Sequence, residues 1–322
     1  MKRMKGLIAI AALVALAGIA WLGSGWWFGS EVEEETSFIV PSGATLTSVA
    51  GKLEEEELIA SADSFLLRAK ILGSGDPVKA GEFLVPAGAT GSAMLDTFQH
   101  GDVINRFVTI PEGTPSIVVH EKLMAEDLLT GDIPVPVEGT VLPDTYSFER
   151  GEERTAVLAR MQAAMRNYLA EAWPKRAAGI AVDNIEDAVT LASIVEKETG
   201  VARERRMVAG LYSNRVKTGM LLQADPTIIY PITKGKPLGR RIRQSEIAAI
   251  NGYNTYTRTG LPEGPITNPG REAIAAVLDP ADTDAVYMVA DGTGGHKFAT
   301  TLADHNANVE EWYALRRDRG EM

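Results

Sequence analysis

The chain has 322 residues, enough for two or three modest domains, and its 45% hydrophobic and 23% charged residues are ordinary for a globular protein. The formal net charge of -11 disfavours a nucleic-acid partner, because binding to phosphates needs clustered Lys and Arg. The chain has no cysteine, which excludes thiol nucleophiles, cysteine-ligated zinc and disulfides.

The N-terminal segment has the pattern of a membrane anchor. Basic residues at positions 2, 3 and 5 precede an uncharged, largely apolar run from Gly6 to Ser30, which ends in tryptophans and is followed by glutamates. At about 1.5 Å per helical residue, such a run crosses a hydrocarbon core of roughly 30 Å. We therefore expect residues 1–30 to form a cytoplasmic tip and a single transmembrane helix in the cell inner (plasma) membrane, with the remaining chain periplasmic or otherwise extracytoplasmic. A cleaved signal peptide processed near Ala15-Leu16-Ala17 is the alternative, but the apolar run continues beyond that point.

A short pattern then recurs three times, at Ile39–Leu46, Leu84–Thr90 and Thr109–Pro115. Each copy predicts a β-strand, a Pro-x-Gly turn and a helix capped by Thr or Ser. The first copy, closed by Val78–Pro86, resembles a LysM module, a small glycan-binding βααβ fold. This resemblance predicts a LysM-like module at residues 31–100, with an α+β spacer as the alternative. Residues 101–150 are expected to be a βα linker region.

The C-terminal part, residues 151–322, has the pattern of a mixed α+β domain. Asp183 and Glu186 form a capping-box-like pair at the start of the second predicted helix. A loop-rich tract follows from Thr218 to Gly270, with a strand expected near Ile228, and loops carry function where a rigid scaffold holds them. The expected helices are 155–173, 185–200, 203–216, 272–278 and 302–317, and a strand is expected at 285–290. The fold class predicted for the whole chain is α+β.

Two glutamates border the apolar face of the helix predicted at 185–200. On a helical wheel of about 100° per residue, Glu196 falls roughly 80° to one side of the apolar arc and Glu198 roughly 80° to the other. Burial beside that arc would favour the protonated carboxyl, which can donate a proton to a glycosidic oxygen. The wheel does not choose between the two residues, and both can equally be solvated edge residues of a buried helix.

The segment Leu191–Thr199, with the sequence LASIVEKET, resembles the signature of the YceG-like (MltG) family of endolytic murein transglycosylases. The resemblance covers most of the chain beyond the predicted anchor and is dense from Leu191 to Asn306. Further matching segments are Glu138–Gly139, Leu142–Tyr146, Ser213–Arg215, Gly219–Tyr230, Tyr253–Tyr256, Gly260–Pro262, Asn268–Gly270, Ala290–Gly292, Gly294–Phe298 and His305–Asn306.

The resemblance implies an enzyme that cleaves the β-1,4 bond between MurNAc and GlcNAc in nascent peptidoglycan and leaves 1,6-anhydroMurNAc ends, so terminating glycan strand elongation. It implies Glu196 as the acid and base, with Glu198 as the reserve candidate. Gln223, Asn254 and Tyr256 are expected to bind the sugar through hydrogen bonds and a ring face, or else to brace their loops. The implied partners are glycan strands, the membrane and peptidoglycan synthases.

No cofactor and no metal are expected. His296 and His305 lack the spacing of HExxH or another familiar metal-binding set. Two other functions are compatible with the pattern. A muramidase would cut the same bond with water, and a non-catalytic scaffold of the wall-synthesis machinery would only bind glycan. The polar, loop-rich tract at 218–270 disfavours the scaffold, because a scaffold needs no polar-lined cleft.

Overall fold

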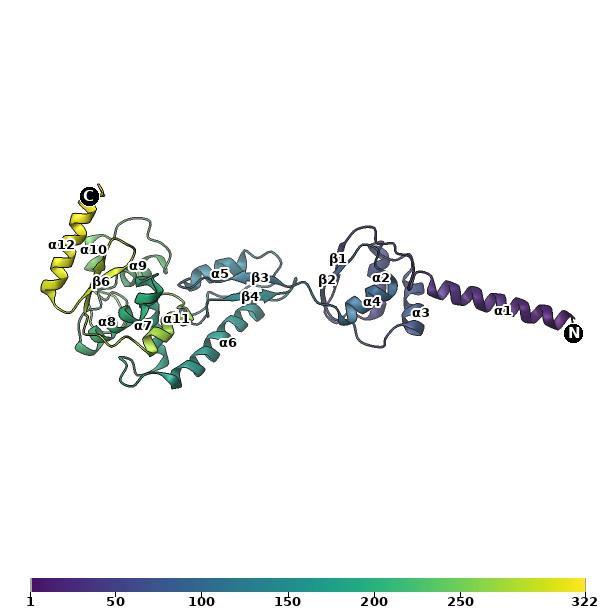
Figure 1. Ribbon diagram of the computed structural model, residues 1–322, viewed down its shortest axis with the longest axis horizontal. Coiled ribbons are helices and arrows are strands. Elements are labelled where there is room, and N and C mark those ends of the chain that lie inside the picture. The colour runs from purple at the N-terminus through teal and green to yellow at the C-terminus, as the bar shows by residue number, and fades with distance from the viewer. Residues whose placement is uncertain (1, 322) are drawn as a thin grey trace. The chain divides into compact units, whose positions relative to one another are not determined.

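A computed structural model describes residues 2–321, with side chains from residue 7 onward (Figure 1). The chain folds as two units with a mixed α+β composition, in agreement with the predicted fold class. The first unit comprises the chain up to Arg106 together with Phe148–Arg150. The second comprises Phe107–Ser147 and the chain from Gly151 onward. Most of the region predicted as a linker therefore belongs to the second unit.

The N-terminal run forms helix α1, Lys2–Gly23. Its described apolar side chains are exposed, for example Leu7 and Ile19. Within the described part of the chain, no helix meets the combined length and apolarity needed to cross a bilayer. Directly after α1 the chain turns, and Trp26 enters the core of the first unit, where its ring lies 5.7 Å from that of Phe65.

The first unit has the expected strand–helix–helix–strand order: β1 (Thr36–Val40), α2 (Leu46–Glu55), α3 (Ala62–Leu72) and β2 (Gly81–Val85), followed by α4 (Gly91–His100). Strands β1 and β2 pair antiparallel, with Thr36 opposite Val85. Both predicted turns are confirmed, since helices α2 and α4 begin after Thr45 and Thr90, whose hydroxyls accept hydrogen bonds from backbone N–H groups of the first turn.

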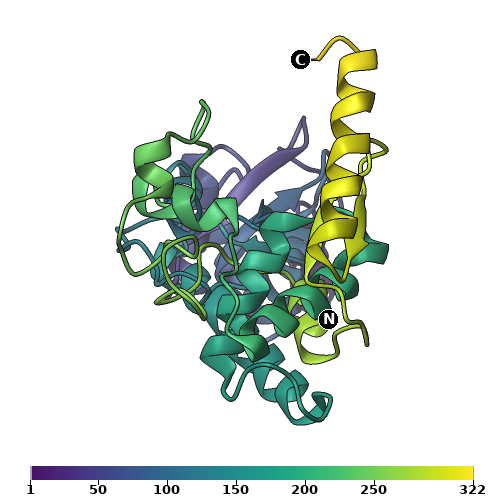
Figure 2. The same ribbon diagram turned by 90° about the vertical axis from the view of Figure 1, so that its left-hand side faces the viewer.

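The second unit is mainly helical around a core formed by α7, α8 and α11. In Figure 2 the C-terminal helix α12 (yellow) stands at one edge of this unit. Strands pair only as β3 with β4 and β5 with β6 in the described chain of this part. Its elements are β3 (Arg106–Thr109), α5 (Ser116–Met124), β4 (Thr145–Phe148), α6 (Arg154–Ala172), η1 (Trp173–Lys175), α7 (Ile185–Glu198), η2 (Ala202–Glu204), α8 (Arg205–Thr218), α9 (Asp225–Thr233), α10 (Gln244–Ile247), α11 (Arg271–Leu278), β5 (Tyr287–Ala290), β6 (His296–Ala299) and α12 (Leu302–Asp318).

Three local predictions for this unit are wrong. Helix α5, which follows the third Pro-x-Gly turn, is not capped by Thr or Ser, because its N-cap is Pro115 and no side chain caps it. The strand expected near Ile228 is helix α9, because Pro226 sits in the first helical turn, where its fixed φ favours a helix and its missing N–H costs nothing. Helix α7 is capped by Asn184 rather than opened by Asp183, since the Asn184 side chain accepts a hydrogen bond of 2.8 Å from the backbone N–H of Asp187.

Candidate active site

Helix α7 carries Glu196 at the edge of the core. Residues 188–195 of this helix are all buried, whereas Glu196 is half-buried. Its Oε2 accepts a hydrogen bond of 2.9 Å from the backbone N–H of Gly270, the residue that precedes α11. The carboxyl group is thus neither sealed in the interior nor free in solvent, and one of its oxygens is held by a main-chain donor.

Asn268 fixes the loop that supplies this donor. Its side chain is fully buried, and its Nδ2 donates to the carbonyl of Thr114 at 2.9 Å and to the hydroxyl of Ser116 at 3.0 Å. Its Oδ1 accepts from the backbone N–H of Val141 at 3.0 Å. The backbones of Thr114 and Asn268 also form an isolated antiparallel bridge. The segment 268–270 is therefore tied to the Pro-x-Gly turn at 111–113, far away in the sequence.

This turn places a second carboxylate beside Glu196. Gly113 has a φ of 70° and lies so close that a Cβ on it would be 3.4 Å from Cγ of Glu196. Glu112 lies over Gly270, where a Cβ would fall 2.0 Å from Oε1 of Glu112. Gly270 therefore leaves room for the Glu112 carboxylate, while its N–H binds Glu196. Two acidic groups meet at one glycine.

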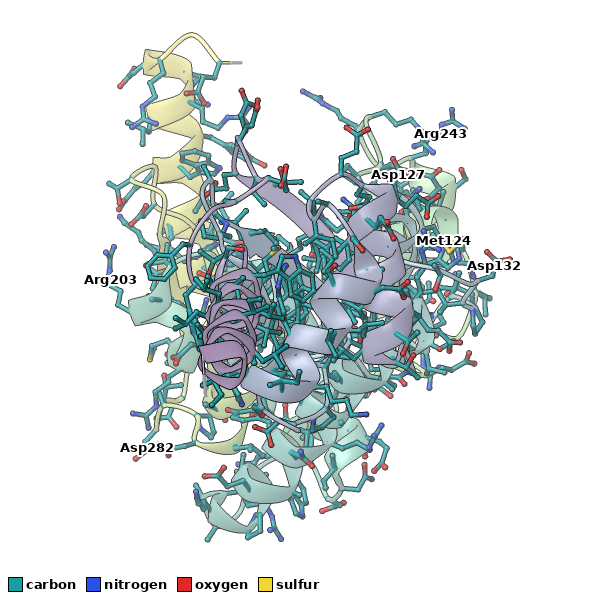
Figure 3. The ribbon with its side chains drawn as sticks, turned by 90° about the vertical axis from the view of Figure 1, so that its right-hand side faces the viewer. Met124, Asp127, Asp132, Arg203, Arg243 and Asp282 are labelled. Carbon is teal, nitrogen blue, oxygen red and sulfur yellow. The ribbon has the colours of Figure 1, made fainter. Side chains whose placement is uncertain are left out.

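Arg205, the first residue of α8, provides the nearby positive charge. Its Nη2 lies 4.0 Å from Oε2 of Glu112, its side chain is 11% exposed, and its Nε has no hydrogen-bond partner among the described atoms. The neighbouring Arg203 is different, because its side chain extends into solvent (Figure 3). Arg205 thus faces the site, and Arg203 does not.

The surroundings of Glu196 favour its protonated form. Burial raises the pKa of the Glu196 carboxyl, and the charge of Glu112 raises it further. The Gly270 N–H, Arg205 and Lys197 act in the opposite direction without cancelling the effect, so the pKa stays above its ordinary value. A raised pKa suits a carboxyl group that must donate a proton near neutral pH.

A cavity of about 520 Å³ lies near Glu196, although the Glu196 side chain does not itself line it. Gly113 and Lys197, which flank Glu196 in space and in sequence, form part of its wall. The opposite wall comes from α9 and from the segment at 235–237. The cavity lies within the second unit and has the volume of a small-molecule or sugar subsite.

Glu198 lies in a different environment. Burial, together with the charge of Asp225, raises the pKa of the Glu198 carboxyl to about 7, and the Tyr212 hydroxyl donates a hydrogen bond to it. Tyr256 donates a hydrogen bond of 2.6 Å to Oδ1 of the same Asp225. The two glutamates are therefore separated as the helical wheel predicted. Glu198 belongs to a buried polar cluster, whereas Glu196 lies beside Gly270 and Glu112.

The three expected sugar-binding residues do not gather around Glu196. Asn254 is fully buried, and its Nδ2 donates to the carbonyls of Ile247 at 2.9 Å and Ala249 at 2.6 Å, which favours the loop-bracing role. Tyr256 joins the cluster of Glu198 through its bond to Asp225. Gln223 is exposed, with a left-handed φ of 51° and its backbone N–H bonded to the carbonyl of Thr255. Of the three side chains, Gln223 is exposed, Tyr256 is half-buried and Asn254 is buried.

Sequence reasoning missed Glu112, Arg205 and Gly270 as parts of the site. Glu112 and Gly270 both lie in segments with a turn signature, Pro-Glu-Gly and Asn-Pro-Gly, which indicated loops but not their contact. The available signals were that each of these turns contains a glycine next to a polar residue and that Gly270 lies in the matching segment Asn268–Gly270. Their meeting depends on the buried Asn268 amide, which no local pattern reveals.

A model of the YceG-like family matches residues 38–311, which is most of the chain and includes every residue of this site. The chain belongs to the YceG-like family. Among relatives, the endolytic murein transglycosylase of Bacillus subtilis (strain 168) is 26% identical over 312 residues, covering 87% of this chain and 85% of that protein.

Two further comparisons agree with the YceG-like assignment. The endolytic murein transglycosylase of Streptococcus pneumoniae serotype 2 is 33% identical over 182 residues; the match covers 54% of this chain but only 32% of that longer protein. The crystal structure of a yceG-like protein from Listeria monocytogenes superposes with a TM-score of 0.52 at 23% identity, covering 85% of this chain and 98% of that one. This likeness shows that the two proteins share a fold.

Proposed function

We propose that this YceG-like protein is an endolytic lytic transglycosylase of peptidoglycan, with Glu196 as its acid and base. The observation that carries the proposal is the position of Glu196. It is half-buried, held on one oxygen by the Gly270 N–H, and next to Gly113 and Lys197, which line a cavity. The relatives from Bacillus and Streptococcus, both endolytic murein transglycosylases by name, support the same activity.

One carboxyl group is sufficient for this reaction. Glu196 first donates its proton to the glycosidic oxygen as the bond from C1 of MurNAc to that oxygen breaks. The resulting carboxylate then accepts the proton of the MurNAc C6 hydroxyl, whose oxygen forms the new bond to C1. No water is consumed, because the C6 hydroxyl returns to Glu196 the proton that Glu196 gave to the leaving oxygen. The product carries a 1,6-anhydro ring. A fixed Gly270 N–H keeps the carboxylate oriented between the two steps.

Glu112 has two effects in this scheme. Its negative charge helps to keep Glu196 protonated before the first step. A carboxylate near the reacting carbon also stabilises the positive charge that develops on the sugar ring as the bond breaks. Arg205 limits the mobility of Glu112, although at 4.0 Å the pair is loose. Glu112 is thus a positioning and electrostatic residue, and Glu196 performs both proton transfers.

Product analysis tests the proposal directly. The purified full chain is incubated with un-crosslinked glycan strands, and the new ends are analysed by mass spectrometry. We expect MurNAc ends lighter by one water than hydrolysed ends, and fragments from within strands rather than single disaccharides. Hydrolysed ends would instead identify a muramidase, and unchanged strands a binding protein.

The Glu112→Gln variant should shift the pH dependence of the reaction. Glu196 is active as the protonated acid, so activity falls as pH rises through its pKa. Removing the neighbouring negative charge lowers that pKa, and the alkaline limb of kcat should move to lower pH. The Glu310→Gln variant, at an exposed position of α12 that does not line the cavity, is the matched control. An alkaline limb that does not move in Glu112→Gln would refute the electrostatic role.

We further propose that α1 anchors the protein in the plasma membrane with its N-terminus in the cytoplasm. The uncharged run from Gly6 to Ser30 and the exposed apolar side chains of α1 support this placement. We also propose that residues 31–100 act as a LysM-like module and that peptidoglycan synthases are partners. If anchoring limits which strands are cut, a version without α1 should release a different glycan length distribution in cells; an unchanged distribution would contradict it.

Gln223 and Tyr256 remain proposed sugar contacts. The exposed Gln223 amide has hydrogen-bonding capacity free for N-acetyl or hydroxyl groups of a glycan, because no side-chain bond to it is found in the described part of the chain. Tyr256 is half-buried and offers part of its ring face. Asn254 would contribute indirectly, by holding the loop at 247–256 in shape.

A further inference from the structure

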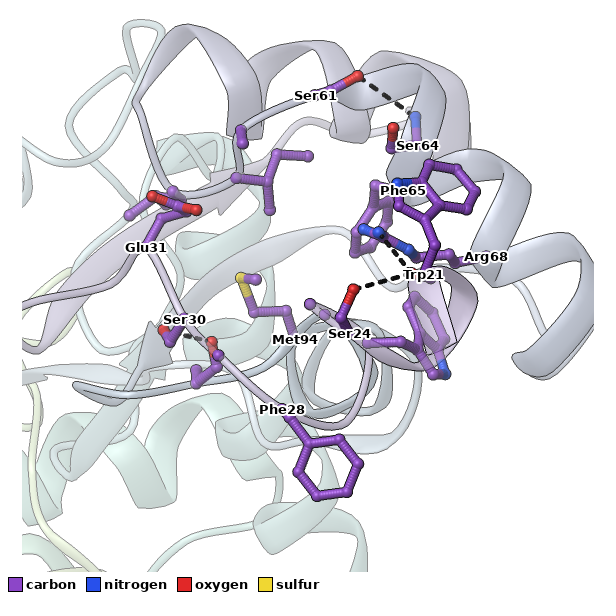
Figure 4. A pocket seen from close by; sticks show the side chains of 18 residues that line it. Trp21, Ser24, Phe28, Ser30, Glu31, Ser61, Ser64, Phe65, Arg68 and Met94 are labelled. Atoms are coloured by element: carbon purple, nitrogen blue, oxygen red, sulfur yellow. Dashed lines mark hydrogen bonds between the residues drawn. The ribbon is translucent and has the colours of Figure 1, made fainter. Parts of the chain in front are cut away.

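The first unit contains a cavity of about 490 Å³ that the proposed reaction does not use. It lies between the end of α1, the segment at 24–31, helix α3 and the start of α4 (Figure 4). Met94 and Phe65 form part of its apolar surface, and serine hydroxyls contribute polar groups. The cavity is therefore amphipathic, and it lies directly beside the helix proposed as the membrane anchor.

Two donors at this cavity lack acceptors. Trp26 is only 1% exposed, yet its Nε1–H has no hydrogen-bond partner among the described atoms. The Nε of Arg68 is likewise buried without a partner, although the guanidinium stacks over the Trp21 ring and its Nη2 donates to the Trp21 carbonyl at 3.0 Å. A buried donor without an acceptor costs about 1–3 kcal/mol, so an acceptor oxygen that reached either group would stabilise the folded unit.

The cavity also presents a negative charge. Glu31 lines it, and in Figure 4 Glu31 and Arg68 lie on opposite sides with Met94 between them. No hydrogen bond or ion pair of the Glu31 carboxylate occurs within the described part of the chain. A ligand with a negative group at one end and a positive group at the other would match both side chains, whereas a simple anion would meet repulsion from Glu31.

The neighbouring surface indicates where such a ligand comes from. Trp21, Trp27 and Phe28 are large aromatic side chains with 47%, 51% and 74% of their surface exposed. Aromatic residues at the end of an apolar helix are typical of the bilayer interface, where lipid headgroups lie. Arginine and tryptophan donors suit a phosphate, and a carboxylate suits a primary ammonium.

We propose that this cavity binds the headgroup of a zwitterionic phospholipid with a primary ammonium, such as phosphatidylethanolamine. The Arg68 guanidinium contacts the phosphate, Glu31 contacts the ammonium, and the acyl chains leave past Trp21 and Phe28 towards the bilayer. The inference rests on the proposed anchoring by α1 but not on the proposed catalysis. Headgroup binding would hold the first unit against the outer leaflet.

Native mass spectrometry of the full chain in maltoside micelles tests the proposal. The protein is titrated with equal amounts of phosphatidylethanolamine, phosphatidylglycerol and phosphatidylcholine, and each retained lipid is identified by its mass. We expect a preference of about tenfold for phosphatidylethanolamine, since a charge-assisted hydrogen bond of about 1.5 kcal/mol corresponds to that ratio. Equal retention of the three lipids would overturn the proposal.

Two variants locate the binding. Arg68→Gln should weaken retention of phosphatidylethanolamine about tenfold or more. Glu31→Gln should reduce the preference over phosphatidylglycerol to near one, and it removes no described contact, so it remains informative if Arg68→Gln disturbs the end of α1. Unchanged retention and preference in both variants would refute the site.

Two controls separate this proposal from the others. Glu196→Gln should retain lipid like the natural chain, so failure of the catalytic proposal leaves this result intact. Cell fractionation tests anchoring by α1 separately from headgroup binding. If an N-acetylglucosamine oligomer displaces the retained lipid and loses its own binding in Arg68→Gln, the cavity is a glycan site and the lipid proposal is wrong.

Discussion

The Glu196→Gln variant should lose nearly all lytic activity while keeping its fold. Glutamine preserves the shape of the side chain, and its amide oxygen can still accept the Gly270 N–H bond. It cannot donate a proton to a glycosidic oxygen or accept one from the C6 hydroxyl, and loss of general acid–base catalysis costs about 10²–10⁴-fold in rate. Anhydro-ended fragments counted by mass spectrometry give the measurement, with circular dichroism as the check on folding.

The matched control is Glu198→Gln, two residues along the same helix. Its amide oxygen can accept the Tyr212 hydrogen bond, and the Gly270 N–H is bonded to Glu196 rather than to this side chain. We expect a loss below about tenfold, because the substitution leaves the proton-transfer group in place. If Glu198→Gln abolished product formation and Glu196→Gln did not, the roles assigned to the two glutamates would have to be exchanged.

Asn268→Ala should be the most damaging substitution outside the proposed acid. It removes a fully buried amide and leaves the Thr114 carbonyl and the Val141 N–H without their side-chain partner. Such losses cost about 3 kcal/mol in total. The Gly270 donor would also be released from its fixed position, so activity should fall along with local stability.

Hydrogen exchange detects this effect where it arises. Peptides covering 111–120 and 264–272 should lose protection in Asn268→Ala, while peptides of the first unit should not change. Asn306→Ala, at an exposed position of α12, is the matched control and should change stability by at most about 0.5 kcal/mol. Equal protection in the two variants would show that Asn268 does not hold the loop.

The sequence predicted elements well where the signal is local. The Pro-x-Gly turns give the starts of α2 and α4, because proline, glycine and a capping threonine each impose their own backbone preference. The helical wheel separated Glu196 from Glu198, and in the structure their carboxyl groups have different partners, Gly270 and Tyr212. Helix α9 was misread because Ile228, Ile229 and Tyr230 form a short apolar run, which periodicity alone does not assign to helix or strand.

The composition of the site was less predictable, because it depends on contacts between distant segments. Glu112 and Gly270 are 158 residues apart in the sequence and meet only because Asn268 joins the two turns. The fate of Asn254 was equally hidden, since an asparagine in a polar loop looks the same whether its amide faces solvent or three carbonyls. The structure shows that the Asn254 side chain is buried and bound to the carbonyls.

The donor that holds Glu196 is the main-chain N–H of Gly270, so the hydrogen bond does not depend on the side chain at position 270. Every amino acid except proline would supply the same N–H, so the hydrogen bond itself tolerates almost any mutation. The choice of side chain at position 270 is restricted because the Glu112 carboxylate occupies the place where a Cβ would lie. A methyl group at this position would displace the Glu112 carboxylate. The distance between the Glu112 and Glu196 carboxylates therefore depends on the absence of a Cβ at residue 270.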